Sequence, residues 1–392
     1  MRVAVVTNLP RPYRHALFNE VARQSGAGAS LAVIYCSEQS MHPRRRQVEA
    51  RCEAAHYARI DAHPSHLLTR GDKVHSIALG LPGLLRKLQP DVAVVAGFGP
   101  DAVDAHVTCR GRGIPVVVWS GAWVGGELPI SRYQRRVRRW LVAGSAAWIG
   151  YGQQASEYLV SLGADPKRVA VAVNTVDLDR FSALAEEGRA APDLAAKYGL
   201  SPRNLLYVGT LEQRKGVREL VEAYAQMNTG GSDCALHLVG SGPLAAGLQD
   251  RAALLPPGKG VRLHGFLQEE EVARLAGHCD LFVCPSLREL WGLVINEAMA
   301  CGLPVVASKH AGATRDLITD GREGYVVDPG QPEELAEKMG LLVRDPELAR
   351  QMGRQAAITV RERASLESSA RGFIRGVEIA LDPRRGATRS AC

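Results

Sequence analysis

The chain has 392 residues, of which 46% are hydrophobic and 23% charged, a composition that excludes a disordered or coiled-coil protein. Its length predicts two domains, and no apolar run reaches the roughly 18 residues that a membrane-spanning helix needs. Residues 1–180 hold 23 Lys and Arg against 14 Asp and Glu, a net charge of +9, whereas the rest hold 25 against 27, a net charge of −2. This asymmetry favours an anionic partner or membrane surface for the first half, although an arginine-rich codon bias would give the same balance.

Short apolar runs alternate with longer helix-period segments through the first half. The runs expected to form strands are, in chain order, Arg2–Thr7, Leu31–Tyr35, Val92–Ala96, Pro115–Trp119, Ala147–Tyr151 and Val169–Val173. Helices are expected between them, among them Tyr13–Gln24, Ser131–Ala143 and Ala155–Leu162. Nearly continuous apolar strands separated by helices are typical of a parallel sheet that helices cover on both faces.

The second half repeats this alternation. Its expected strands are Asn204–Val208, Ala235–Val239, Val261–His264, Leu281–Cys284, Pro304–Ala307 and Gly324–Val327. Its expected helices are Gly216–Ala225, Glu269–Ala276, Leu293–Ala300, Pro332–Leu342 and a last one at about 366–380. We therefore predict an α/β protein with two Rossmann-like, doubly wound parallel-sheet domains facing across a cleft. The domains are expected at 1–180 and 181–392, joined near 174–190, with the last helix packing back on the first domain.

Two absences narrow the function. Neither a GxGxxG nor a GxxxxGK[ST] motif occurs, which disfavours a dehydrogenase or a P-loop ATPase. The eight cysteines stand singly without a CxxC pair, so we expect neither a disulfide framework nor a zinc site. Reduced thiols are typical of a cytoplasmic protein.

The segment 284–308 is the most informative in the chain. It leaves a strand, turns through a loop, enters a helix and exits at Gly302 into the next strand. The loop therefore lies at the carboxyl edge of a parallel sheet, where open α/β folds bind ligands. The amides of residues 292–294 open the helix and suit an anion. Glu289 and Glu297 would repel phosphate, so they suit the neutral hydroxyls of a sugar and a ribose.

A second cluster, residues 207–216, follows the first strand of the second half and opens a helix. Arg214 and Lys215 stand at the helix start, where the helix dipole disfavours cations. An anion bound between them would explain their placement. The alternative, two solvated surface cations, stays open.

Residues 289–305 read ELWGLVINEAMACGLPV, which resembles the E-x7-E signature of retaining GT-B glycosyltransferases, close to glycosyltransferase family 4. The 207–216 loop is similar to the G-R-L-x-x-x-K-G loop of that family. Leu290 and Thr210 depart from the usual Gly and Arg, and Arg214 is expected to supply the missing charge. The turn at 238–243 and the loop at 263–266 are similar to further family motifs.

The resemblance implies a retaining, nucleotide-sugar-dependent glycosyltransferase of the hexosyltransferase type, with a hydroxyl acceptor. Lys215 and Glu289 would be catalytic. A UDP- or GDP-sugar would be the donor, with no metal and no other cofactor. The donor-binding residues that the resemblance implies are Gly209, Thr210, Arg214, Lys215, Gly240, Phe266, Glu289, Leu290, Trp291, Gly292, Leu293, Val294 and Glu297. Two alternatives stay open: a non-catalytic GT-B partner subunit, and a sugar-nucleotide epimerase of the same fold.

The first domain is expected to bind the acceptor, whether a glycan, a lipid-linked group or a small molecule. The candidate residues are Arg11, Tyr13, Arg14 and Ser120. The segment 131–143 predicts an amphipathic helix with four arginines on one face. That helix would either pack its apolar face on the sheet with its arginines solvated, which we favour, or lie on an anionic membrane. We therefore expect a cytoplasmic protein and leave contact with the inner membrane face as the alternative. No nucleic-acid partner is expected.

Overall fold

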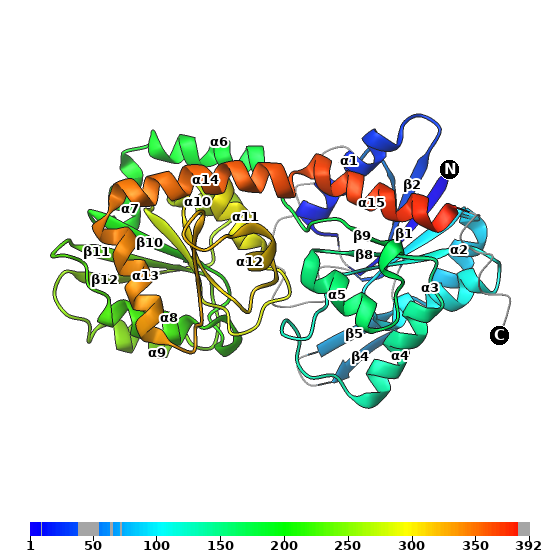
Figure 1. Ribbon diagram of the computed structural model, residues 1–392, viewed down its shortest axis with the longest axis horizontal. Helices are drawn as coiled ribbons and strands as arrows, with labels where there is room; N and C mark the ends of the chain where they lie inside the picture. The colour runs from blue at the N-terminus through cyan, green and yellow to red at the C-terminus, as the bar shows by residue number, and fades with distance from the viewer. Residues whose placement is uncertain (9, 38–54, 63–65, 71–72, 383–392) are drawn as a thin grey trace. The chain divides into compact units, whose positions relative to one another are not determined.

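The computed structural model describes residues 1–8, 10–37, 55–62, 66–70 and 73–382. It divides into two compact units (Figure 1). The N-terminal unit comprises Met1–Val124, Pro129–Asn174 and Leu366–Cys392, and the C-terminal unit comprises Gly125–Leu128 and Thr175–Ser365. Within the described ranges, each unit is built around its own parallel sheet, as the alternation of apolar runs and helices predicts.

The described strands of the N-terminal sheet follow the order β3-β2-β1-β6-β7-β8-β9. Their bounds are β1 Arg2–Thr7, β2 Ser30–Tyr35, β3 Ala58–Asp61, β6 Val92–Ala96, β7 Val116–Ser120, β8 Ala147–Gly150 and β9 Val169–Val171. All neighbours pair in parallel. An antiparallel hairpin of β4 (His66–Arg70) and β5 (Lys73–Ile77) was not predicted.

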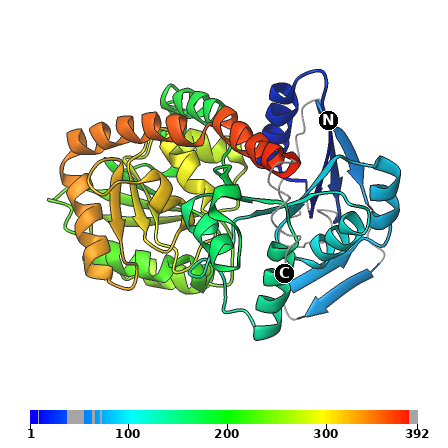
Figure 2. The same ribbon diagram turned by 45° about the vertical axis from the view of Figure 1, so that its right-hand side comes forward.

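Helices cover both faces of this sheet. On one face α1 (Pro12–Ser25) and α15 (Leu366–Leu381) pack against a core that contains Phe18, Trp119 and Phe373. Figure 2 shows α15, in red, lying along α1, in dark blue. The other face is covered by α2 (Leu81–Leu88), α3 (Pro100–Arg110) and α5 (Gln153–Ser161).

The described strands of the C-terminal sheet follow the order β12-β11-β10-β13-β14-β15, again in parallel. Their bounds are β10 Arg203–Val208, β11 Cys234–Val239, β12 Lys259–Gly265, β13 Leu281–Cys284, β14 Val305–Ser308 and β15 Gly324–Val327. The chain first winds outward from β10 and then returns to place β13 on its other side. The loops after β10 and β13 therefore meet where the winding reverses, the usual ligand position in such sheets.

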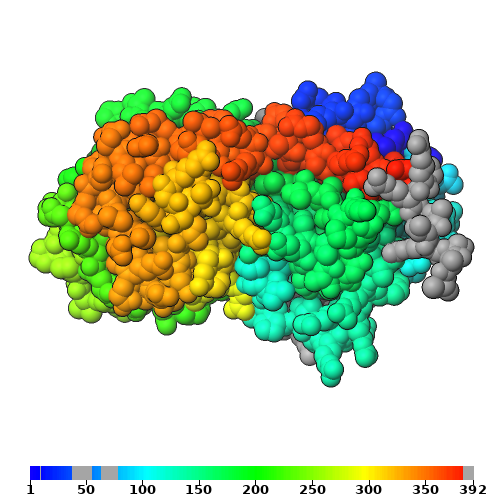
Figure 3. Space-filling model, in the orientation of Figure 1, coloured from blue at the N-terminus to red at the C-terminus, as the bar shows by residue number. Residues whose placement is uncertain are grey.

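Helices on the C-terminal sheet complete that unit. They are α6 Leu178–Arg189, α7 Asp193–Tyr198, α8 Val217–Gln226, α9 Ala245–Ala252, α10 Glu269–Ala276, α11 Leu293–Ala300, α12 Gly312–Leu317, α13 Pro332–Arg344 and α14 Pro346–Ala364. Figure 3 shows α13 and α14, in orange, on the surface of the unit. α14 packs on α11, the helix that follows the Glu289 loop.

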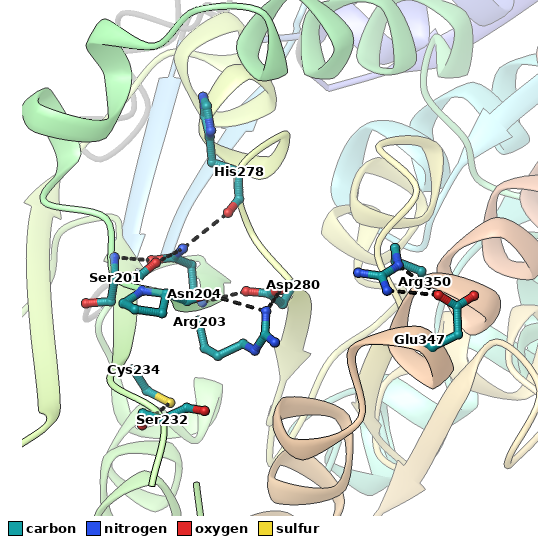
Figure 4. Close-up of polar contacts among 10 residues, drawn as sticks. Ser201, Arg203, Asn204, Ser232, Cys234, His278, Asp280, Glu347 and Arg350 are labelled. Atoms are coloured by element: carbon teal, nitrogen blue, oxygen red, sulfur yellow. Dashed lines mark hydrogen bonds and ion pairs between the residues drawn. The ribbon is translucent and has the colours of Figure 1, made fainter. Parts of the chain in front are cut away.

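Polar contacts tie the amino ends of β10 and β13 together (Figure 4). The backbone N–H of Asn204 donates to Asp280 at 2.7 Å, and Arg203 lies 3.5 Å from the same carboxylate. The side-chain amide of Asn204 donates to the carbonyls of Ser201 and His278. These contacts fix the relative register of the two strands whose opposite ends carry the candidate site.

Two expectations about organisation need correction. The predicted boundary after residue 180 falls inside α6, and the structure sets the boundary between Asn174 and Thr175. Most of the expected linker is helical because Asp177 caps α6 by accepting from the backbone N–H of Arg180.

The basic segment 131–143 also differs in detail from its prediction. It forms α4 (Arg132–Ala143), which begins with a capping box between Ser131 and Gln134. Leu141 and Val142 are buried, whereas the aromatic side chains of Tyr133 and Trp140 are 75% and 44% exposed, so the apolar side of the helix is only partly covered. Among the described residues, no helix is both long and apolar enough to cross a membrane.

Six of the cysteines lie in the described part of the chain, and all six are free thiols. They are Cys36, Cys109, Cys234, Cys279, Cys284 and Cys301. Cys52 and Cys392 lie outside the described residues.

Candidate functional site

The carboxyl edge of the C-terminal sheet presents closely packed backbone. The N–H of Gly209, after β10, donates to the carbonyl of Val239 at 2.9 Å, and that of Gly240 donates to Gly265 at 2.7 Å. Gly240 has a φ of 134°, and a Cβ there would lie 1.9 Å from the carbonyl oxygen of Gly209. Only glycine fits this position, so the edge offers backbone rather than side chains to a ligand.

Lys215 and Glu289 meet at this edge. The Lys215 ammonium donates to the Glu289 carboxylate, and both side chains are largely buried, with 15% and 14% of their surface exposed. Lys215 ends a short 3₁₀ turn that stops at Gly216, whose φ is 66°. A Cβ on Gly216 would lie 1.9 Å from the Pro285 carbonyl oxygen, so the loop after β10 packs tightly against the end of β13. The fold thus joins two side chains that lie 74 residues apart.

Arg214 extends the charge cluster. Its guanidinium lies 3.6 Å from Glu289 and 2.8 Å from Glu212. Thr210, the residue that stands in the family's Arg position, donates its hydroxyl to Glu212 at 2.8 Å. Burial opposes ionisation of Glu212, yet the Thr210 hydrogen bond and the Arg214 charge hold its pKa below the usual value. Arg214 is therefore shared between two carboxylates, although 43% of its side chain remains exposed.

The loop after Glu289 turns into α11 through Gly292. Gly292 has a φ of 95°, and the amides at the start of α11 have no acceptor within the helix. Leu293 and Val294 are half-buried, and Leu290 is exposed. Trp291, another predicted donor-binding residue, is buried.

The buried Trp291 side chain has a structural role. Its indole N–H donates to the Asn296 side chain at 3.0 Å, and its carbonyl accepts from Ala313 at 2.9 Å. Trp291 and Asn296 thereby fix the loop that carries Glu289. Asn296 was not selected from the sequence, where nothing distinguishes it from any other polar helix residue.

Glu297 lies apart from the Lys215–Glu289 pair. It is half-buried, and burial raises its pKa to about 8, with the nearby charge of Glu269 contributing. Glu269 itself lies 3.3 Å from Arg180, so the closest carboxylate already has a cation. Burial therefore favours the protonated form of Glu297 in the free protein, whereas the ionised form is the stronger hydrogen-bond acceptor.

Phe266 follows β12 and is 39% exposed, beside a pair of histidines that sequence reasoning missed. His264 stacks on His237, and His237 Nδ1 lies 2.9 Å from His264 Nε2. The Nε2 atom of His237 donates to the side-chain oxygen of Asn204 at 3.1 Å. Burial first, and the neighbouring His264 second, lower the pKa of His237 to about 3. Both rings are neutral, and they brace the loop that carries Phe266.

In the N-terminal unit, the predicted acceptor residue Arg14 lies in a cluster of hydroxyl and aromatic side chains. Its guanidinium donates to the hydroxyls of Thr7 and of Tyr151, the latter at 2.6 Å, and lies 5.0 Å from the ring centre of Trp119. Tyr13 is half-buried and hydrogen-bonds to Arg14. Tyr151 and Thr7 were not selected from the sequence, because only the fold brings the ends of β1 and β8 to the start of α1.

The remaining two acceptor candidates lie at the same sheet edge. Arg11 is the half-buried N-cap residue of α1 and has further contacts of its own. Ser120, the last residue of β7, is 3% exposed, and its hydroxyl accepts from the Ala122 N–H at 3.1 Å.

Comparison with known proteins follows this division of the chain. Residues 17–180 match the model of Glycosyltransferase Family 4, and residues 195–359 match that of Glycosyl transferases group 1. The chain is 30% identical over 315 residues to a D-inositol 3-phosphate glycosyltransferase of Pseudarthrobacter chlorophenolicus, covering 71% of each. It is 35% identical over 189 residues to the alpha-D-kanosaminyltransferase of Streptomyces kanamyceticus, but this match spans only 46% of each protein.

Solved structures share the fold at low identity. Anabaena HepE in complex with UDP matches 96% of this chain and 100% of its own, with a TM-score of 0.73 and 18% identity. Sucrose-phosphate synthase of Thermosynechococcus elongatus matches 96% and 98%, with a TM-score of 0.69 and 19% identity. With its two parallel-sheet units and these relatives, the chain belongs to the glycosyltransferases of group 1 and family 4, which have the GT-B fold.

Proposed function

We propose that the protein transfers a hexose from a nucleotide-sugar to a hydroxyl acceptor with retention of anomeric configuration. The observation that carries this proposal is the Lys215–Glu289 contact at the reversal point of the C-terminal sheet, beside the amides that open α11. A cation, a carboxylate and free amides at one sheet edge match the diphosphate and the sugar hydroxyls of such a donor.

The roles divide by charge. Lys215 and Arg214 contact the diphosphate, together with the amides of residues 292–294. Glu289 accepts from donor-sugar hydroxyls, and Glu297 accepts from the ribose. The Phe266 side chain and the backbone at Gly209 and Gly240 contact the nucleoside.

The chemistry is a front-face displacement. The bond between the anomeric carbon and the diphosphate oxygen breaks, and the acceptor oxygen bonds to that carbon from the same side. The acceptor proton passes to the departing diphosphate oxygen. Lys215 and Arg214 stabilise the charge that develops there, which is often the largest single contribution to catalysis.

The proposal assigns no metal and no other cofactor to this step, because two cations and the helix amides already oppose the diphosphate charge. We propose a UDP- or GDP-sugar as donor. Anabaena HepE, which shares the fold, has been solved in complex with UDP and glucose, and a Mycolicibacterium smegmatis relative is named as a GDP-mannose-dependent mannosyltransferase.

The acceptor is assigned to the N-terminal unit. One relative is named for D-inositol 3-phosphate, and another is named for the kanosaminyl group that it transfers, so the relatives' names do not point to one common acceptor. We also propose contact of α4 with an anionic membrane surface, since Tyr133 and Trp140 are exposed beside its arginines. That contact would place the protein at the cytoplasmic face of the membrane.

The test is a transfer assay with UDP-glucose and GDP-mannose against a panel of glycan, lipid-linked and small hydroxyl acceptors. Release of nucleoside diphosphate is measured with and without EDTA, and the anomeric configuration of the product is read by NMR. Lys215→Ala should lower turnover about 10²–10³-fold. Lys309→Ala, which removes an exposed lysine paired with Asp328 in the same unit, is the matched control and should leave turnover unchanged. An inverted product, or activity that EDTA abolishes, would contradict the proposed chemistry.

A further inference from the structure

Arg14 is a cation whose contacts in the described part of the chain are all neutral. Its two terminal nitrogens donate to the Thr7 and Tyr151 hydroxyls, and it also bonds to Tyr13. Its Nε is buried and has no hydrogen-bond partner there. No carboxylate of the described residues lies within ion-pair distance of this guanidinium, in contrast to the cations of the C-terminal site.

A charged side chain without an ion-pair partner destabilises the folded chain when no anion is bound. A cation removed from water loses solvation energy, and neutral hydroxyls return only part of it. The cation–π contact with Trp119, 5.0 Å from the ring centre, returns a further part. A group that remains charged among neutral partners is well suited to an anionic ligand.

The hydroxyls around Arg14 are oriented for an oxyanion. Because Tyr151 accepts from Arg14, the proton of its own hydroxyl is left to donate elsewhere, and Thr7 is in the same position. Burial raises the pKa of Tyr151, so the phenol keeps that proton. Two hydroxyls that each keep a proton to donate therefore lie against one guanidinium, whose Nε has no partner in the described part of the chain, and such donors suit the oxygens of a phosphate.

The location agrees with a ligand site. Thr7 ends β1, Trp119 lies near the end of β7, and Tyr151 follows β8, so the cluster lies at the carboxyl edge of the N-terminal sheet. Gly121 makes room for it, since a Cβ there would lie 2.3 Å from the Tyr151 ring. β1 is also the strand at which the winding of this sheet reverses.

We propose that Arg14, with Tyr151 and Thr7, binds a phosphate group carried by the acceptor. This rests on the proposed transferase function and narrows the acceptor to a phosphorylated hydroxyl compound, either a soluble phosphate ester or a lipid-linked phosphate. The donor diphosphate already has its own cations, Lys215 and Arg214, in the other unit.

The test compares variants of the full chain by thermal unfolding and calorimetry. The soluble probe is sn-glycerol 3-phosphate, and the lipid probe is a phosphatidylcholine vesicle with and without phosphatidic acid. Arg14→Met keeps length and apolar contacts but removes the charge. Arg138→Met is the matched control, because Arg138 likewise donates to a tyrosine hydroxyl, Tyr158, and lies against aromatic rings in the same unit.

We expect glycerol 3-phosphate to stabilise the wild type, Arg138→Met and Lys215→Ala against thermal unfolding. Its affinity for Arg14→Met should be at least tenfold lower than its affinity for the wild type. In phosphate-free buffer, Arg14→Met should unfold at or above the wild-type temperature, because an unpaired buried charge has been removed. A lipid-linked acceptor is indicated if the phosphatidic-acid vesicles, but not the soluble ester, show the Arg14 dependence.

Three results would overturn the proposal. Phosphate binding that survives in Arg14→Met, or that disappears in Lys215→Ala, would place the anion elsewhere. A markedly lower unfolding temperature of Arg14→Met would show that Arg14 is structural. Loss of UDP binding in Arg14→Met would assign Arg14 to the donor instead. If neither UDP nor GDP binds to the wild type or the variant while the phosphate dependence persists, the transferase proposal fails and the phosphate site stands.

Discussion

The two units place a cation at equivalent edges of similar sheets, but they treat it differently. In the C-terminal unit, Lys215 is neutralised by Glu289 and Arg214 is shared between two carboxylates. In the N-terminal unit, Arg14 contacts only neutral oxygens and rings in the described residues. A cation that is paired with a carboxylate stays neutralised when no ligand is bound, so binding and release of a ligand change its electrostatic energy little. A cation without a carboxylate partner is neutralised only when an anionic ligand binds.

The largest effect on turnover is expected when the carboxylate of Glu289, which pairs with Lys215, is replaced by a neutral amide. Glu289→Gln should lower turnover about 10²-fold or more, because the proposed contacts to donor-sugar hydroxyls weaken. It should raise the affinity for UDP, because Lys215 no longer shares its charge with a carboxylate. Steady-state kinetics and calorimetry on the same preparation measure both quantities. A fall in both would show that Glu289 positions Lys215 rather than competing with the diphosphate.

A second, smaller effect concerns Glu297 and depends on pH. Because burial raises its pKa to about 8 from an ordinary 4.5, the folded protein retains a proton that the unfolded chain loses between these values. Stability due to this group therefore falls as pH rises from about 4.5 to 8. Glu297→Gln should unfold at a higher temperature than the wild type, with a difference that widens over this window and is constant above it.

The same substitution should weaken nucleotide binding. Loss of a hydrogen bond between a ribose hydroxyl and a carboxylate corresponds to about a 10–100-fold lower affinity for UDP. Wild-type affinity should rise as pH approaches 8, since ionised Glu297 is the better acceptor, whereas the Gln variant should show no such rise. A pH-independent wild type would rule out this role for Glu297.

The smallest effect is expected on α4, where the arginines are exposed rather than enclosed. Changing Arg135 and Arg139 to Ser should alter stability by no more than about 0.5 kcal/mol. It should reduce binding to anionic vesicles and make that binding less sensitive to salt. Co-sedimentation at two salt concentrations tests this, with neutral vesicles as the control. Unchanged binding would leave α4 simply solvated.

The regular part of the fold could be predicted because buried parallel strands are written in the chain as apolar runs. The expected bounds of β1, β6, β13, β15, α10 and α11 agree with the structure. α6 was not predicted as a helix because its turn-like start, Asn174 to Asp177, suggested a linker. The exposed strand β3 and the hairpin lack the apolar pattern that identified the others.

The candidate site divides in the same way. Lys215 and Glu289 lie in local motifs that can be read from spacing, so both were selected before their contact was known. The burial of Trp291 could not be predicted, since a motif position does not reveal whether a side chain faces solvent or the core. Tyr151 and Asn296 carry no local signal, because their importance comes from partners that the fold brings to them.

The most direct test of the central claim is calorimetric titration of UDP, GDP, ADP and dTDP into the wild type, Lys215→Ala and the Lys309→Ala control. We predict that one of the four nucleotides binds the wild type and the control equally, with a thermal stabilisation of about 2.7 kcal/mol at a hundred times its dissociation constant. Lys215→Ala should lose that binding while keeping its fold. Binding of none of the four, or equal binding to Lys215→Ala, would contradict a donor site built on the Lys215–Glu289 pair.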